Sequence, residues 1–311
     1  MTKSLNSISY SLLVQRSHPF ISLCCGLILL AGCSSEPVVD SDPLPKIVIA
    51  MEPDKDPDAM LEDRRALQGY LSADTGKTVE AIIPLSSAVI YEGLKNGSID
   101  LAYLSSTAAA KLLENGAVDM LLAELIDGQP FYQSYWIARK DAPYQSIADL
   151  RGWPIAFSSR TSTSGFLIPV WDLYTQGLID LENGPQGFFG AGNVFYGVGY
   201  VSAAERVLDG SAEAAAVSYY VLDQDKHLSA AQRARLKVVD TQGPVPSHVV
   251  MVRQALPEQD RDVLRRSLLQ INTAAPELRD RIFGAPLAPA DADTHLRSTL
   301  EALELMRTMR F

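Results

Sequence analysis

From Lys46 onward, short strand-like runs alternate with amphipathic helix-like stretches, and this alternation strongly constrains the fold. The run KIVIAM at 46–51 precedes a helical pattern in which Met60, Leu67 and Leu71 share one face. Further strand-like and helix-like runs follow in the same order. Such alternation predicts an α/β protein with mostly parallel sheets covered by helices.

The pattern continues beyond residue 130, which predicts a second α/β lobe. The extended segment 132–139 (YQSYWIAR) and the strand-like run 154–157 lead to a helix beginning near Gly165, and a Gly/Asn-rich loop follows at 183–193. Two lobes of about 100 residues each suit the length of the chain. Near the C-terminus we expect two amphipathic helices.

The N-terminal segment has the pattern of a lipoprotein export signal. Two basic residues precede an apolar run at 20–30, which is shorter than the ~20 residues that span a bilayer and ends in LAGC. We interpret residues 1–32 as a signal peptide, Cys33 as the lipidated residue and residues 33–45 as a tether. We therefore expect a membrane-anchored lipoprotein in the periplasm, and Ser34 is typical of outer-membrane sorting.

The cysteines and the net charge exclude several classes of function. Cys24, Cys25 and Cys33 all lie in the export segment, so cleavage would leave no disulfide and no cysteine nucleophile. Residues 1–32 carry two basic and no acidic side chains, so the mature chain would have 25 basic against 37 acidic residues, a net charge of −12. Such a surface repels nucleic acid, and anion capture would depend on local hydrogen bonds.

One polar turn carries the strongest chemical signal. Residues 161–165 (TSTSG) follow a strand and open an apolar helix, which places hydroxyl and backbone N–H groups at one helix N-terminus, as in anion sites. In the alternative interpretation one serine caps the helix and its neighbours are ordinary loop residues. Arg160 either adds charge to the site or points into solvent. The acids Glu52, Asp54 and Asp100 are expected to be solvated.

The segment STSGFLIP at 162–169 resembles the signature of the phosphonate- and phosphite-binding (PhnD-type) substrate-binding proteins of ABC transporters. The resemblance extends in order from Lys46 nearly to the C-terminus, through segments such as IDLAY at 99–103 and DLRG at 149–152. It implies a type 2 periplasmic-binding fold, in which two lobes joined by hinge strands close on a ligand in the cleft. The first lobe would combine residues 46–130 and 249–311, and the second lobe residues 131–248.

The resemblance also implies which side chains bind the ligand. In the family the turn grips the oxyanion, an aromatic residue lines the cleft at the position of Tyr132, and many members have tyrosine where this chain has Ser87. Tyr200 stands where members often have histidine, and His248 either enters the cleft or caps a strand. The expected ligand-binding residues are Ser162, Thr163, Ser164, Tyr132, Ser87, Tyr200, Tyr103 and His248.

Two further positions bear on the ligand that the resemblance implies. Members that select amino-substituted phosphonates have carboxylates where this chain has Tyr220 and His248. The resemblance therefore disfavours aminoalkylphosphonates, because an ammonium group would lose its partners unless Asp223 or Asp225 replaces them.

The remaining motifs favour binding over catalysis. The mature chain would keep only His227, His248 and His295, with no metal-binding spacing, and it has no nucleophile elbow or nucleotide-binding loop. We therefore expect no metal, no cofactor and no enzymatic activity. The expected function is capture of phosphonate, phosphite or phosphate by a monomer that delivers it to an ABC-transporter permease. Ligand reporting to a sensor partner and hydrolysis of small phosphorus esters stay open as alternatives.

Overall fold

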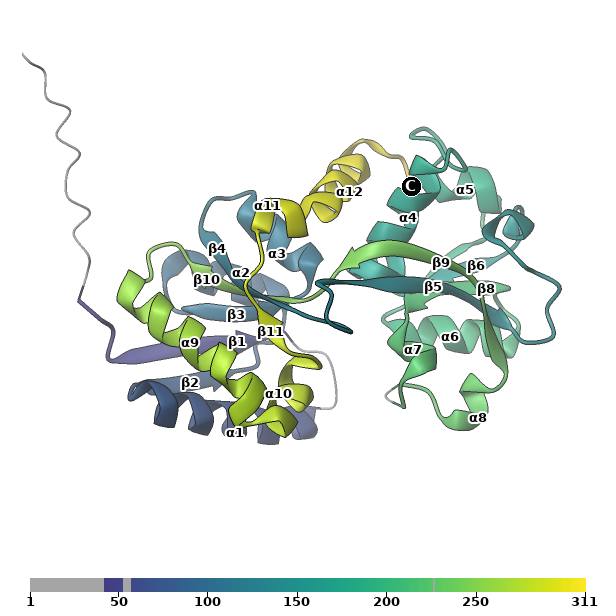
Figure 1. The fold of residues 1–311 in the computed structure, drawn as a ribbon. Coiled ribbons are helices and arrows are strands. Elements are labelled where there is room, and N and C mark those ends of the chain that lie inside the picture. The colour runs from purple at the N-terminus through teal and green to yellow at the C-terminus, as the bar shows by residue number, and fades with distance from the viewer. Residues whose placement is uncertain (1–41, 53–56, 226) are drawn as a thin grey trace, which may run out of the picture. The chain divides into compact units, whose positions relative to one another are not determined.

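The computed structural model describes residues 42–52, 57–225 and 227–311, which fold into two α/β lobes, each built around one sheet (Figure 1). The expected signal peptide, Cys33 and all but the last residues of the tether lie outside the described residues. The two-lobe α/β architecture predicted from the sequence is confirmed.

The first lobe contains a six-stranded sheet in the order β11-β4-β10-β3-β1-β2. Its strands are β1 (Lys46–Met51), β2 (Thr78–Ile82), β3 (Leu101–Leu104), β4 (Val118–Glu124), β10 (Val249–Arg253) and β11 (Leu287–Ala288). β1 runs parallel to β2 and β3, but β10 lies antiparallel between β3 and β4. The prediction of a mostly parallel sheet is therefore wrong: β10 returns from the second lobe and enters the sheet from the opposite end.

Seven helices accompany this sheet in the described sequence of the first lobe. They are α1 (Pro57–Thr75), α2 (Ser87–Asn96), α3 (Ser106–Leu113), α9 (Glu258–Ala274), α10 (Pro276–Phe283), α11 (Ala292–His295) and α12 (Arg297–Thr308). The predicted apolar face of α1 is confirmed, because Leu67 and Leu71 are fully buried in one core with Leu264 and Leu268 of α9. The two amphipathic helices predicted near the C-terminus form as α9 and α12, whereas α10, α11 and the short strand β11 between them were not predicted.

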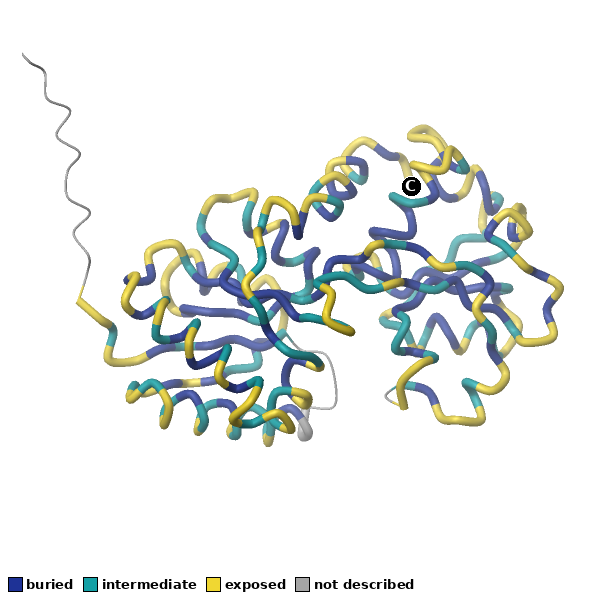
Figure 2. The backbone as a smooth tube through the Cα atoms, viewed as in Figure 1, coloured by how far each residue is buried: buried dark blue, intermediate teal, exposed yellow. Residues whose placement is uncertain are grey.

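The second lobe contains a five-stranded sheet in the order β7-β6-β8-β5-β9. Its strands are β5 (Phe131–Arg139), β6 (Ile155–Phe157), β7 (Val194–Tyr196), β8 (Ala214–Ser218) and β9 (Leu236–Pro246). β6 is parallel to β7 and β8, whereas β5 is antiparallel to β8 and β9. Its core includes the fully buried rings of Trp136, Phe157 and Phe189. In Figure 2 buried backbone follows the strands of both sheets.

The helices of the second lobe include one that the sequence pattern missed. They are η1 (Ile147–Leu150), the π-helical turn η2 (Thr163–Leu167), α4 (Ile168–Thr175), α5 (Gly184–Phe189), α6 (Tyr200–Asp209), α7 (Tyr220–Asp223) and α8 (Ala230–Arg233). α5 lies in the segment predicted as a loop. Pro185 fits the first turn of a helix, and burial of Phe188 and Phe189 stabilises a segment whose glycines disfavour helix formation.

The C-terminal segment packs on both lobes. Helix α12 contacts α3 of the first lobe and α4 and η2 of the second. Beyond the helix, Met309 joins the core of the second lobe, and the ring of Phe311 lies against Phe166. The Arg160 guanidinium lies 3.9 Å from the Tyr196 ring centroid and 5.4 Å from that of Phe311. The Arg160 guanidinium therefore makes cation–π contacts with these two aromatic rings.

Asp100 was predicted to be a solvated acid, and this prediction is wrong. Its side chain is buried and forms an ion pair with Arg253 Nε at 2.7 Å, while its second oxygen accepts a hydrogen bond from the backbone of Val48 at 2.8 Å. The carboxylate thus links β1 to β10.

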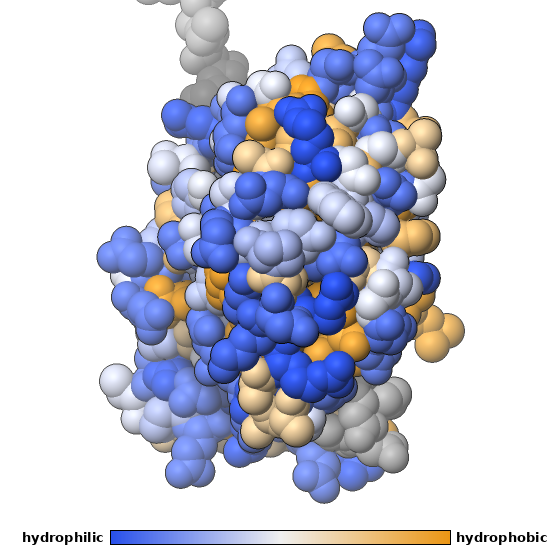
Figure 3. All heavy atoms as spheres, turned by 90° about the vertical axis from the view of Figure 1, so that its right-hand side faces the viewer, coloured by the Kyte–Doolittle hydropathy of each residue, from blue (hydrophilic) through white to orange (hydrophobic). Residues whose placement is uncertain are grey.

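On the face of the second lobe seen in Figure 3, apolar side chains form only small, separate patches among hydrophilic ones.

Candidate functional site

The polar turn identified in the sequence begins η2, as the entry to a longer helical segment. Ser162 is its N-cap, and its Oγ accepts a hydrogen bond from the backbone N–H of Gly165 at 2.9 Å. The N–H groups of Thr163 and Ser164 lie in the first helical turn, where no intrahelical acceptor is available. The capping interpretation is thus correct for Ser162, and the turn also offers backbone donors to an anion.

Close packing explains why glycine follows the three hydroxyl residues. A Cβ atom added to Gly165 would lie 2.4 Å from Ser158 Oγ and 2.5 Å from Ser158 Cβ. Ser158 is itself fixed at the end of β6, where its Oγ donates a hydrogen bond to the carbonyl of Ala216 at 2.7 Å. The turn is therefore held tightly against the sheet of the second lobe.

Thr163 connects the turn to the first lobe. Its Oγ1 accepts a hydrogen bond from the backbone N–H of Thr107 at 3.2 Å and lies 2.7 Å from Thr107 Oγ1. Thr107 belongs to the first turn of α3, so the N-termini of η2 and α3 approach each other at this point. The Thr163 side chain is buried. An anion at the turn would therefore lie near the start of α3, where the Thr107 N–H already donates to Thr163.

Tyr200 lies beside the other two hydroxyls of the turn. Its phenol oxygen lies 2.7 Å from Ser164 Oγ and accepts a hydrogen bond from Ser162 Oγ at 3.3 Å. The position that the family resemblance assigns to histidine thus reaches the turn in this chain, with a tyrosine. A phenol can donate a hydrogen bond to an anion but adds no positive charge.

Further tyrosines surround the turn and are neutral donors. Burial raises the pKa of Tyr132 well above its usual value, and the Tyr200 phenol adds to the rise. Burial, with smaller effects of Glu124, Asp127 and Asp223, raises the pKa of Tyr219 to about 12. These phenols therefore keep their protons at neutral pH. The rings of Tyr132 and Tyr219 lie 5.5 Å apart, centroid to centroid.

The opposite wall, in the first lobe, is organised by Glu52, which directly follows β1. One of its carboxylate oxygens accepts a hydrogen bond from Ser87 Oγ at 2.6 Å, and the other accepts one from the backbone N–H of Ser105 at 2.9 Å. These donors belong to the first residue of α2 and the N-cap of α3. Glu52 was predicted to be a solvated acid, but it ties two helix N-termini together.

The other polar groups of this wall meet at Tyr103. Its ring stacks on that of His248 with centroids 5.4 Å apart, and its phenol donates a hydrogen bond to the carbonyl of Phe283 at 2.9 Å. His248 Nδ1 lies 3.7 Å from the carboxylate of Glu124, which is an ion pair when the histidine is protonated. Of the two interpretations of His248, the structure therefore favours the one in which it enters the cleft.

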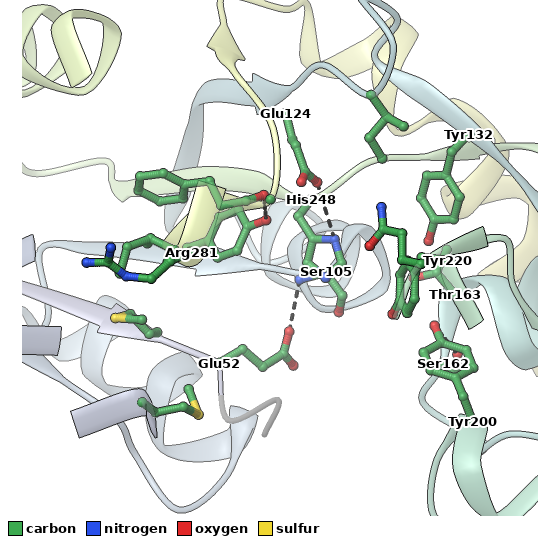
Figure 4. A pocket seen from close by; sticks show the side chains of 18 of the residues that line it. Glu52, Ser105, Glu124, Tyr132, Ser162, Thr163, Tyr200, Tyr220, His248 and Arg281 are labelled. Carbon is green, nitrogen blue, oxygen red and sulfur yellow. Dashed lines mark hydrogen bonds and ion pairs between the residues drawn. The ribbon is translucent and has the colours of Figure 1, made fainter. Parts of the chain in front are cut away.

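These two walls enclose a cavity of about 510 Å³ (Figure 4). The structure brings together at this cavity all the ligand-binding residues expected from the sequence except Ser164, which is fully buried behind Tyr200. The additional lining side chains that the sequence analysis did not select as ligand-binding include Glu52, Asp63, Glu124, Tyr219, Asp280 and Arg281. Glu52 directly follows β1, and Glu124 is the last residue of β4. Ligands of α/β proteins bind at such strand ends, so this position in the sequence could have identified both residues as candidate ligand contacts.

The described part of the chain contains no cluster of three or more histidine, aspartate or glutamate side chains that could hold a metal ion. Among the same residues, none of the helices has both the length and the apolar character needed to cross a bilayer.

The cavity offers hydroxyl, phenol and backbone donors on one wall and carboxylates on the other, an arrangement suited to holding a small polar ligand.

Comparison with protein-family models identifies one family. The model described as "ABC transporter, phosphonate, periplasmic substrate-binding protein" matches residues 49–295. Among curated proteins, the chain is 28% identical over 199 residues to the phosphate-import protein PhnD of Mycolicibacterium smegmatis. That match covers 61% of this chain and 61% of the relative's own length.

Solved structures share the fold. A protein of Xanthomonas citri bound to chloride ion has a TM-score of 0.73 and 24% identity, with 85% of this chain and 99% of that chain covered. PhnD1 from Prochlorococcus marinus in complex with methylphosphonate has a TM-score of 0.69 and 16% identity, with 86% and 100% covered. These likenesses confirm the two-lobe, type 2 periplasmic-binding fold expected from the sequence.

Proposed function

Because this chain belongs to the family of periplasmic phosphonate-binding proteins of ABC transporters, we propose that it captures a small phosphorus oxyanion between its lobes and delivers it to a membrane permease. The observation that carries the proposal is the turn at Ser162–Gly165, where Ser162 and Thr163 line the cavity at the start of a helix beside the Tyr200 phenol. Hydrogen-bond donors at a helix N-terminus bind anions without a cationic side chain.

The size of the cavity bears on the class of oxyanion. Its volume of about 510 Å³ lies within the range of small-molecule sites and exceeds what a bare phosphate or phosphite needs. We propose phosphonates, which carry an organic substituent, as the preferred ligands over phosphite and phosphate, because the family model that matches this chain is described by phosphonate. The substituent would lie among the rings of Tyr103, Tyr132 and Tyr219.

Lobe closure on the ligand is part of the proposal. The closing bodies would be residues 46–130 with 249–311, and residues 131–248, with the C-terminal helix α12 of the first body also packed on the second. Strand membership supports this division. Strands β5 to β9 form the five-stranded sheet of the second lobe, and the other strands of the described chain form the six-stranded sheet of the first lobe. Closure would bring the wall that contains Glu52 toward the turn, and only a ligand that binds the closed form better can drive it.

A binding screen tests the proposal. Methylphosphonate, ethylphosphonate, phosphite, phosphate and sulfate would be compared by thermal shift and then by calorimetry, since a ligand that binds only the native state raises its stability. We expect the largest shift from a phosphonate. A screen in which none of the phosphorus oxyanions shifts the melting temperature would contradict the proposal. Phosphorus NMR of the recovered ligand should show no chemical change.

We propose that the export pattern anchors the protein through lipid on Cys33, after removal of residues 1–32. A Cys33→Ser variant should lose metabolic labelling with a fatty-acid analogue and either appear in the soluble fraction or stay uncleaved. Cys25→Ser is the matched control, because it removes a thiol from the same segment and should keep the label. Equal labelling of both variants would contradict the anchor.

A further inference from the structure

The acidic side chains that line the cavity differ in their partners. Asp63 pairs with Arg281 at 2.9 Å, Asp280 pairs with Arg279 at 2.6 Å, and Glu124 lies 3.7 Å from His248. Glu52 accepts hydrogen bonds from two neutral donors, Ser87 Oγ and the Ser105 N–H, and it takes part in none of the ion pairs found among the described residues. Among these four carboxylates, Glu52 is thus the one without a basic side chain beside it in the described lining.

The position of Glu52 gives this charge a consequence. Its carboxylate already occupies the N-terminal ends of α2 and α3, where a ligand anion would otherwise find donors and a favourable helix dipole. Figure 4 shows Glu52 and Ser162 on opposite sides of the cavity. Anion binding is thus favoured at the turn rather than at the starts of α2 and α3, and a second negative group that lies near them would face the Glu52 carboxylate.

We propose that Glu52 is a specificity-determining residue that excludes ligands with a second anionic group. This inference depends on the proposed function, because it concerns the substituent of an oxyanion held at the turn. At an effective dielectric constant near 20, two like charges closer than about 12 Å repel strongly enough to change affinity by roughly tenfold or more. A neutral substituent of the same size meets no such repulsion.

The test uses phosphonoacetate and phosphonoacetamide, which differ in the carboxylate and its amide. Calorimetry on the wild-type protein should give at least roughly tenfold weaker binding of phosphonoacetate. In Glu52→Gln the amide oxygen can still accept from the Ser105 N–H while the amide NH2 donates to Ser87 Oγ, and the two affinities should converge through tighter binding of phosphonoacetate. Glu52→Asp keeps the charge and should keep the discrimination. Glu92→Gln, an exposed residue of α2 outside the cavity lining, is the matched control and should behave as wild type.

The wild-type protein supplies a second readout that does not depend on any variant. Because the discrimination is electrostatic across a solvent-accessible cavity, it should shrink as potassium chloride is raised from 20 mM to 500 mM. Equal affinities for the two ligands in the wild type, or equal losses for both in Glu52→Gln, would overturn the role of Glu52 while leaving oxyanion capture intact. Failure of both ligands and of methylphosphonate to bind would instead overturn the proposed function.

Discussion

The second-lobe wall of the cavity and the first-lobe wall use helix N-termini in opposite ways. At the turn, Ser162 caps its helix with a neutral hydroxyl, and the neighbouring N–H groups have no intrahelical acceptor. Across the cavity, Glu52 brings a full negative charge to the starts of α2 and α3. The same local feature is therefore receptive to an anion on one side and already satisfied on the other.

The difference shows how an acidic protein can bind an anion selectively. The second-lobe wall contributes hydroxyls, phenols and Gln224 to the cavity, and among the described lining residues 131–248 there is no aspartate, glutamate, lysine or arginine. Attraction is short-ranged and directional there, so it depends on the geometry of the turn. The charged side chains of the first-lobe wall can then act on the rest of the ligand.

The largest effect is expected from making both walls acidic. In Thr163→Asp a carboxylate would occupy the turn. Two like charges about 4 Å apart, at an effective dielectric constant near 20, repel by about 4 kcal/mol. Repulsion between this carboxylate and the phosphonate should therefore lower phosphonate affinity at least a hundredfold. Thr163→Val removes the hydroxyl without adding charge and should cost roughly tenfold or less. Calorimetry and melting curves on both variants measure this. Wild-type affinity in Thr163→Asp would remove the turn from the binding site.

A smaller effect is expected from deforming the receptive wall without changing its charge. In Gly165→Ala the new methyl group would overlap Ser158, so the turn must shift, at about 1–3 kcal/mol of stability. We expect lower affinity together with a lower melting temperature. Gly69→Ala, in α1, is the control, because no atom lies within 4 Å of its added Cβ and alanine favours the helix. Unchanged affinity in Gly165→Ala would mean that the turn geometry is not needed.

Removing one donor from the receptive wall should have a modest effect. Tyr200→Phe deletes the phenol oxygen that lies 2.7 Å from Ser164 Oγ, and a neutral hydrogen bond contributes about 0.5–1.5 kcal/mol. Phosphonate affinity should therefore fall between about twofold and tenfold. Tyr174→Phe, at an exposed position of α4, should leave it unchanged. A loss in Tyr200→Phe as large as in Thr163→Asp would show that the phenol is a dominant contact.

The smallest effect concerns a group outside both walls. His295 is buried, its Nε2 lies 3.1 Å from the Ser247 carbonyl, and burial lowers its pKa below the usual 6.5. A lowered pKa means that the neutral form stabilises the fold fully above pH ~6.5 and that this stability is lost as pH falls further. One proton limits the slope to about 1.4 kcal/mol per pH unit. Denaturant unfolding at pH 7.5 and 5.5 should show less loss in His295→Gln than in wild type.

Much of the fold was predictable because it depends on local periodicity. The buried face of α1 and the start of the helix after the turn are encoded in neighbouring residues. The antiparallel insertion of β10 was not predictable, because it depends on pairing with β3 and β4 more than 100 residues earlier in the chain. Helix α5 was missed for a related reason: tertiary burial of Phe188 and Phe189 overrides the local effect of its glycines.

The site was predictable where its residues form one continuous segment. The turn at 161–165 showed itself through its hydroxyls and the helix that follows. Glu52 and Asp100 looked alike in the sequence, as single acids at the ends of strand-like runs. Their partners, Ser87 and Ser105 for one and Arg253 for the other, are brought to them only by the tertiary fold. A single sequence does not encode such pairings in its local pattern.

The strand order of the first sheet has a consequence for biogenesis. β10 occupies the middle of that sheet, between β3 and β4, yet it is synthesised after the whole of the second lobe. A nascent chain that ends before residue 249 therefore exposes two unpaired strand edges, which favour aggregation. The second sheet, whose strands are contiguous in sequence, can form earlier. The sheet of the first lobe thus cannot be completed until β10 has been synthesised, and a premature stop before residue 249 leaves the lobe that is encoded first without its middle strand.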